Sequence, residues 1–126
     1  MSFSNTFETR ILQWTFTTGS PTRPTAWYVA LFTDDPTDVG TGTEVSGGSY
    51  ARTAVTFTVS GDTASNSGAV EFPEATGSWG TITHMGIYDA STSGNLIAHA
   101  ALSASKAIAS GDILRFPIGD LDVTLA

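Results

Sequence analysis

Three aspartates lie close together in the sequence and could bind a hard cation. Asp34, Asp35 and Asp38 occupy one stretch that also contains proline and glycine, and calcium takes six to eight oxygen ligands. An EF-hand loop that begins at Asp35 would need ligands where the chain has Val39 and Ser46. Asp and Pro are also the usual residues of solvated turns. We therefore interpret this cluster as a turn rather than as a cation site.

The other candidates for catalysis lack the spacing that their chemistry needs. His84 and His99 lie in separate predicted strands, without the His-x-His or His-Glu-x-x-His pattern that brings metal ligands together. No Gly-x-Ser-x-Gly elbow positions a serine nucleophile, and Glu71 and Glu74 can both face water instead of a common cleft. Cysteine is absent, which excludes disulfides, thiolate metal sites and cysteine nucleophiles. We expect no catalytic residue, no cofactor and no metal.

The aromatic side chains could support a different chemistry, the stacking of sugar rings. Trp14, Trp27 and Trp79, with three tyrosines, could form such a platform, because aromatic faces suit both carbohydrates and protein interfaces. Trp27 lies in the most apolar stretch and is expected in the core. Trp79 follows a Gly-Ser pair in a loop and is a better candidate than Trp27 for an exposed contact. A loop tryptophan that closes the end of a β-sandwich is nevertheless the commoner explanation.

The composition indicates one β-rich domain and excludes two classes of partner. The 126 residues include 12 acidic and 5 basic side chains, with Lys106 as the single lysine. The net charge of −7 repels nucleic acid, whose binding depends on Lys and Arg. The longest apolar stretch, residues 26–32, is too short to span a membrane, and no secretory signal opens the chain. We expect neither nucleic acid nor a membrane as a partner.

The first third of the chain predicts a helix, a strand and a long connection. Apolar side chains recur near the helical period between residues 5 and 16, with Asn5 as the expected N-cap and Glu8 three residues later. Two prolines then force a loop, and residues 26–33 favour a central strand covered on both faces. The connection 34–48 exceeds the usual loop length, so it is either functional or folded onto the body.

Turn residues divide the rest of the chain into short strands. Residues 51–60 alternate as one strand, with Val55, Phe57 and Val59 on one face, and further strands are predicted at 69–72, 82–89, 96–102, 113–117 and 121–125. This spacing is typical of an antiparallel sandwich or a partly open barrel. We predict a mainly β protein with one domain, residues 1–126. A helical N-terminal segment at 1–18 precedes an antiparallel β-sandwich of seven or eight short strands at 26–126, jelly-roll-like or partly open.

An ordered set of motifs spans nearly the whole chain. Its members are the helix at 5–16, the stretch 27–33 followed by Asp-Pro at 35–36, and the stretches 42–52, 72–76, 79–89 and 111–116. In this order the motifs resemble a family of small bacteriophage virion proteins labelled phage tail fibre protein. The family commonly has a smaller or aliphatic residue where this chain has Trp27, so the packing there is expected to differ.

The resemblance implies a non-enzymatic structural protein exposed on a tailed-phage virion and assembled in the host cytoplasm. A low lysine content suits interfaces, which are poor in lysine. Our main interpretation is therefore a multi-copy capsid decoration or cement protein bound to the major capsid protein. The alternatives are a tail fibre or tail-tip component bound to tail proteins, and a lectin-like module that binds a host-surface glycan.

Two segments are predicted to form interfaces with other chains. The N-terminal segment has more apolar area than a small body easily hides, unless the helix caps an open end of its own sandwich. The connection 34–48 could lie along a neighbouring subunit, with Arg52 paired to an acidic group there. The predicted interface residues are Phe3, Phe7, Ile11, Trp14, Glu44, Val45, Tyr50, Arg52 and Trp79. We expect a homo-oligomer, and analogy with phage fibres and decorations predicts a trimer.

Overall fold

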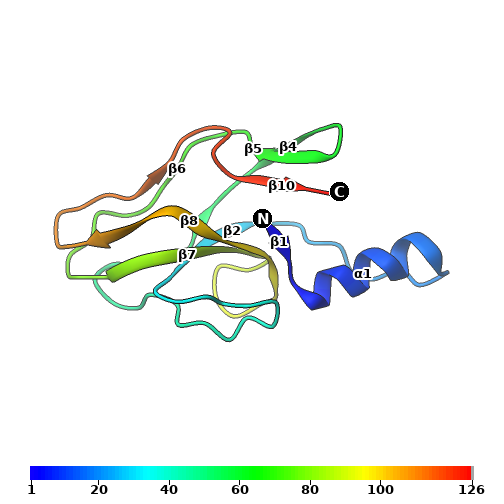
Figure 1. Cartoon of the computed structure of the whole chain (residues 1–126), viewed down its shortest axis with the longest axis horizontal. Coiled ribbons are helices and arrows are strands. Elements are labelled where there is room, and N and C mark those ends of the chain that lie inside the picture. Colours follow the sequence, from blue (N-terminus) through cyan, green and yellow to red (C-terminus); the bar gives the residue numbers. More distant parts are fainter. Residues whose placement is uncertain (126) are drawn as a thin grey trace.

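The computed structural model describes residues 1–125 and is mainly β, as predicted. Its strands pair antiparallel throughout the described residues. The elements are β1 (Ser2–Phe3), α1 (Asn5–Phe16), β2 (Tyr28–Phe32), β3 (Thr53–Ala54), β4 (Phe57–Ser60), β5 (Thr63–Asn66), β6 (Val70–Glu71), β7 (Gly80–Tyr88), β8 (Leu96–Ile108), β9 (Arg115–Phe116) and β10 (Asp122–Thr124). The architecture is that of a β-sandwich with one short N-terminal helix (Figure 1).

Three sheets make up the β body. The main sheet has the order β1-β8-β7-β2-β3, a second sheet has the order β10-β5-β4, and β6 pairs with β9. Strand β2 lies inside the main sheet, where it pairs with β7 along its whole length and with β3 at one end. Residues 29–32 are buried, which confirms the prediction of a strand covered on both faces.

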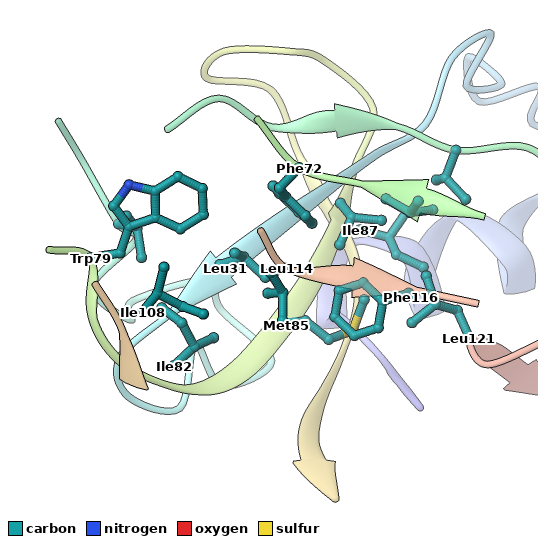
Figure 2. Close-up of a cluster of buried hydrophobic side chains, with 14 of the residues drawn as sticks. Leu31, Phe72, Trp79, Ile82, Met85, Ile87, Ile108, Leu114, Phe116 and Leu121 are labelled. Atoms are coloured by element: carbon teal, nitrogen blue, oxygen red, sulfur yellow. The ribbon is translucent and has the colours of Figure 1, made fainter. Parts of the chain in front are cut away.

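The hydrophobic core fills the space between one face of the main sheet and the chain segments around β6 and β9. Leu31 and Met85 point into it from β2 and β7, and Phe72 and Phe116 meet them from the opposite side (Figure 2). The Phe72 ring lies within 6.4 Å of three other aromatic rings, those of Tyr50, Trp79 and Phe116. Fully burying each large side chain of this kind contributes about 1.5–3 kcal/mol, so this cluster is the main source of stability.

A smaller cluster lies on the other face of the main sheet. Its members are Ala30, Phe32, Tyr88 and Leu96. Ala30 and Phe32 alternate along β2 with Val29 and Leu31 of the main core. The connection 34–48 packs against this cluster at Gly40, where a Cβ would lie 3.7 Å from the Leu96 side chain. It also pairs with the end of β2, where the amide of Thr33 donates to the Thr43 carbonyl at 3.1 Å. Of the two interpretations of this long connection, the structure therefore supports folding onto the body.

Helix α1 has the predicted bounds, but its N-cap is Ser4 and not Asn5. The hydroxyl of Ser4 accepts a hydrogen bond from the Phe7 amide at 3.3 Å and donates one to the Leu96 carbonyl at 2.5 Å. Ser4 is buried beside β8, so the cap also fastens the first turn of the helix to the main sheet. Beyond that turn, α1 leads away from the body (Figure 1).

Several strand boundaries differ from the prediction. Residues 51–60 do not form one strand: they divide into β3 and β4, which belong to different sheets. Val55, between them, is buried, whereas Val59 is exposed. Strands β1 and β5 were not predicted because two residues or a polar stretch give no apolar alternation, and β8 continues past 102 through small polar residues.

A comparison of two phenylalanine substitutions tests where the core lies. Phe72→Ala removes a fully buried ring, so we expect the free energy of unfolding to fall by about 3–5 kcal/mol. Phe16→Ala removes an exposed ring from α1, so we expect a change within about 0.5 kcal/mol. Denaturant unfolding of dilute protein measures both values. Equal losses for the two variants would contradict this assignment of the core.

Candidate interaction surface

A charged cluster joins the end of the long connection to the main sheet. The guanidinium of Arg52 donates to both carboxylate oxygens of Glu44, from Nε at 2.9 Å and from Nη2 at 2.8 Å. Its Nη1 donates to the carbonyls of Ala90 and Ser93 at 3.0 and 2.7 Å. The guanidinium also lies 3.7 Å from the centre of the Tyr88 ring. This bidentate, stacked geometry is specific to arginine.

Burial and pairing together set the ionisation of this cluster. Burial alone would lower the pKa of Arg52, but the hydrogen bonds and charge of Glu44 outweigh it and raise that pKa above its ordinary value. The Tyr50 hydroxyl donates to Glu44 at 2.7 Å and accepts from the Leu31 amide at 3.0 Å. Burial, followed by the hydrogen bond to Glu44, raises the pKa of Tyr50 far above that of free tyrosine. Burial also raises the pKa of Tyr88.

The cluster corrects one sequence-based expectation. Arg52 was expected to pair with an acidic group of a neighbouring subunit, but its partner is Glu44 of the same chain. The Arg52 side chain is only 8% exposed, because β7 and the segment after it cover it. Glu44, Tyr50 and Arg52 thus hold the chain together and present little surface to a partner.

Trp79 and Val45 are also internal. Of the two positions expected for Trp79, the exposed contact is wrong and the commoner one, closing the end of the sandwich, is correct: its indole is buried and donates from Nε1 to the Gly48 carbonyl at 2.9 Å. Gly48 has φ +58°, and a Cβ there would lie 2.9 Å from the indole nitrogen. Only glycine allows this approach, so Trp79 closes one end of the sandwich. Val45 is buried in the same core.

The N-terminal residues divide into a docked half and a projecting half. Phe7 is buried, Phe3 is half-buried against the core, and Ile11 is half-buried beside the cleft between α1 and the strap, residues 20–24. Further along the helix, Leu12 is 58% exposed, Trp14 71% and Phe16 78%. We call these last three residues the α1 tip. Leu12 and Phe16 share one face of the helix, whereas Trp14 lies on the other with Ile11.

An apolar groove lies between the β10-β5-β4 sheet and the main sheet. It lies next to the strap, residues 20–24, which leads from α1 toward β2. Val59, Ala64 and Val123 stand opposite one another across the three strands of that sheet. With Phe57 and Trp27 they line a groove of about 310 Å³, and we call it the β4 groove. Arg23 of the strap borders both this groove and the cleft between the strap and α1.

Two of the aspartates lie beside one histidine: Asp35 Oδ1 is 3.8 Å from Nδ1 of His99 and Asp38 Oδ1 is 2.8 Å from its Nε2, whereas Asp34 and His84 have other partners. The Asp34 carboxylate accepts from the Thr43 amide and hydroxyl, Asp35 accepts from the Thr37 amide at 2.8 Å, and Asp38 contacts the His99 Nε2 at 2.8 Å. His84 contacts the neighbouring Thr83 hydroxyl. Within residues 1–125, no three His, Cys, Asp or Glu side chains converge on one point that could hold a metal.

Comparison with known proteins identifies the family. A family model described as Podophage GP4 fiber I protein gp80 matches residues 2–124. The chain belongs to this family. A search of curated proteins finds no match. Membership in a phage fibre family confirms the resemblance and makes the protein a structural component of a virion.

One further property of this fibre-family protein concerns membranes. No helix in the part of the chain that the structure describes is long and apolar enough to cross a bilayer.

Replacing the buried arginine tests the charged cluster. Arg52→Lys keeps the charge but removes the bidentate contact to Glu44 and the stacking on Tyr88. We expect a loss of about 1–3 kcal/mol in the free energy of unfolding, because buried acceptors lose their partners. Arg115→Lys is the matched control: Arg115 is exposed and has no ion pair among the described residues, and its effect should stay within about 0.5 kcal/mol. Equal effects would contradict the role given to Arg52.

The raised pKa of Tyr50 predicts a loss of stability in alkali. The folded protein keeps the phenolic proton that the unfolded chain releases near pH 10. Stability from Tyr50 is therefore complete below about pH 10 and is lost as the pH rises above that value. Denaturant unfolding at several alkaline pH values should show this decline. Tyr50→Phe should reduce it to the smaller part that comes from Tyr88, whose pKa is also raised. A decline as steep in Tyr50→Phe as in the wild-type protein would assign it to other groups.

Proposed function

We propose that the protein is a multi-copy structural component of a phage tail fibre, joined to other virion chains through the α1 tip. The family match over residues 2–124 supports the fibre rather than the capsid decoration that was our main interpretation. A domain of this size has a radius of gyration near 14 Å, so one copy cannot bridge tens of nanometres. It acts as one unit among many.

The observation that carries this proposal is the α1 tip, which exposes three large apolar side chains within five residues of one helix. The interface residues predicted from the sequence fall into two groups. Phe7, Val45 and Trp79 are buried in their own chain, and the Glu44 cluster is satisfied internally. Ile11 and Trp14, with Phe3 at the edge of the groove, remain in the proposed surface, and Leu12 and Phe16 join them.

The position on the particle distinguishes the fibre from the alternatives. A label on this chain, viewed by electron microscopy of intact phage, should lie on the tail. Labels spread over the capsid would establish the decoration interpretation and overturn the fibre one. Binding of the isolated protein to a glycan array, without its presence in particles, would instead support the lectin-like module.

Polar substitution of the α1 tip should reduce incorporation into particles. In a phage whose copy of this protein carries Trp14→Gln and Phe16→Gln, we expect the number of copies per purified virion to fall at least about tenfold. Gln retains helix propensity, so the helix itself should persist. Ile118→Gln is the control, because Ile118 is as exposed as the tip but lies on the β body. Full incorporation of the tip variant would exclude α1 as the attachment element.

A further inference from the structure

Strand β8 has the longest free edge among the residues that the structure describes. It spans 13 residues, and β7 pairs with one side of it from Leu96 to Ile108. On the other side, β1 pairs only with Ala98 and His99 (Figure 1), so no described strand lies beside residues 100–107. The backbone amides and carbonyls of such an edge are able to pair with a strand of another chain.

The composition of this edge favours pairing rather than preventing it. Residues 100–107 contain neither proline nor glycine, and Lys106 is their single charged side chain. Small side chains let a second backbone approach closely, and uncharged segments without proline pair readily with copies of themselves. The outermost strands of the three sheets elsewhere have two to four residues, and short edges limit pairing by their length. Strand β8 needs another form of protection.

One form of protection is a bulge in β8. Lys106 stands opposite Ile82 of β7, and Ala101 stands opposite His84. Residues 102–105 therefore face Thr83 alone, and they divide the free edge into two short stretches. Natural proteins use bulges at sheet edges to interrupt the regular spacing that a further strand would need.

The second form of protection is the direction in which Lys106 projects. Residues that stand opposite one another in a sheet project from the same face, so Lys106 projects from the same face as Ile82. Ile82 and Ile108 lie side by side in the main core (Figure 2). Lys106 thus points to the core side of the sheet, where it lines a hollow of about 310 Å³ with Leu114 and Phe116. A charged side chain that points inward at a free edge is a known defence against strand addition.

The charge of Lys106 is not neutralised by a close partner. Among residues 1–125 it has no ion pair. Asp120 and Asp122 line the same hollow, but the Asp122 carboxylate accepts a hydrogen bond from the Ser65 hydroxyl. Lys106 is exposed, so water solvates its ammonium group at the open side of the sandwich.

A strand added beside β8 would cover Lys106 from its open side. Covering a charge that has no partner is costly, because the lost hydration is not replaced. A second copy of β8 brings no acidic residue that could compensate, since residues 96–108 contain none. Pairing of two β8 edges would instead place two lysines in one sheet.

From these observations we propose that Lys106 is a gatekeeper residue, which prevents copies of this protein from joining through the free edge of β8. The bulge shortens the edge, and the inward lysine makes the remaining stretch costly to cover. Association between copies is thereby left to other surfaces. This inference goes beyond the proposed function, because it does not depend on which chain contacts α1.

Lys106→Thr removes the charge and tests the proposal. Threonine suits a strand, and the change shifts the net charge of the chain from −7 to −8, which increases the general repulsion between copies. We nevertheless expect the concentration at which copies associate to fall at least about tenfold, because the edge becomes free to pair. Sedimentation velocity of the purified full chain measures this concentration, and circular dichroism checks that the variant is folded.

Two variants serve as matched controls. Arg23→Thr makes the same change in net charge on the strap, where Arg23 is exposed, and it should associate no more than wild-type protein does. Lys106→Arg keeps the positive charge at the edge and should also behave as the wild-type protein. If Lys106→Thr associates no more than wild-type protein, or if either control associates as strongly as Lys106→Thr, the proposal is wrong.

Hydrogen exchange locates the new contact. In associated Lys106→Thr, the amides of residues 100–107 that face away from β7 should exchange more slowly than in wild-type protein, because they donate to a second strand. The amides of α1 should exchange at the wild-type rate. Association without slower exchange at residues 100–107 would place the contact elsewhere and would overturn the role given to Lys106.

Discussion

The ion pair between Arg52 and Glu44 is the contact on which the arrangement of the other elements depends. It holds the connection 34–48 against the main sheet. There, Glu44 pairs with Phe32 at the free edge of β2. Without that cover, backbone groups at the end of a buried strand would lack partners, and each such group costs about 1–3 kcal/mol. Arg52 also lies on the Tyr88 ring, which covers the second core cluster.

The same connection reaches the base of the helix. The Asp38 carbonyl accepts from the Asn5 amide at 3.0 Å, and its carboxylate contacts His99 on β8. One end of the connection therefore positions α1 and the other end completes the sheet. Helix α1 has only one buried residue, yet its direction is fixed. The reason is that its first turn is hydrogen-bonded both to β8 and to the 34–48 connection.

The buried polar side chains have their hydrogen-bond partners, but some large apolar side chains remain exposed. Among the described residues, no buried side-chain nitrogen or oxygen lacks a hydrogen-bond partner. The buried polar side chains are thus satisfied within the chain, whereas the α1 tip and the β4 groove still expose apolar area. In a protein that belongs to a phage fibre family, the natural use of such area is contact with other chains.

The sequence by itself determined the class of fold, the helix bounds, the buried strand β2 and the family, because these follow from local periodicity, turn residues and ordered motifs. It could not assign Ser4 as the cap, since the deciding partner, Leu96, is 92 residues away. Nor could it show that Trp79, Val45 and Arg52 face inward: an aromatic, a valine and an arginine suit an interface and a core equally well. Tertiary structure decided that question, because burial depends on which distant segments cover a side chain. For the same reason only the structure separated the buried Phe7 from the exposed Trp14 on a single helix.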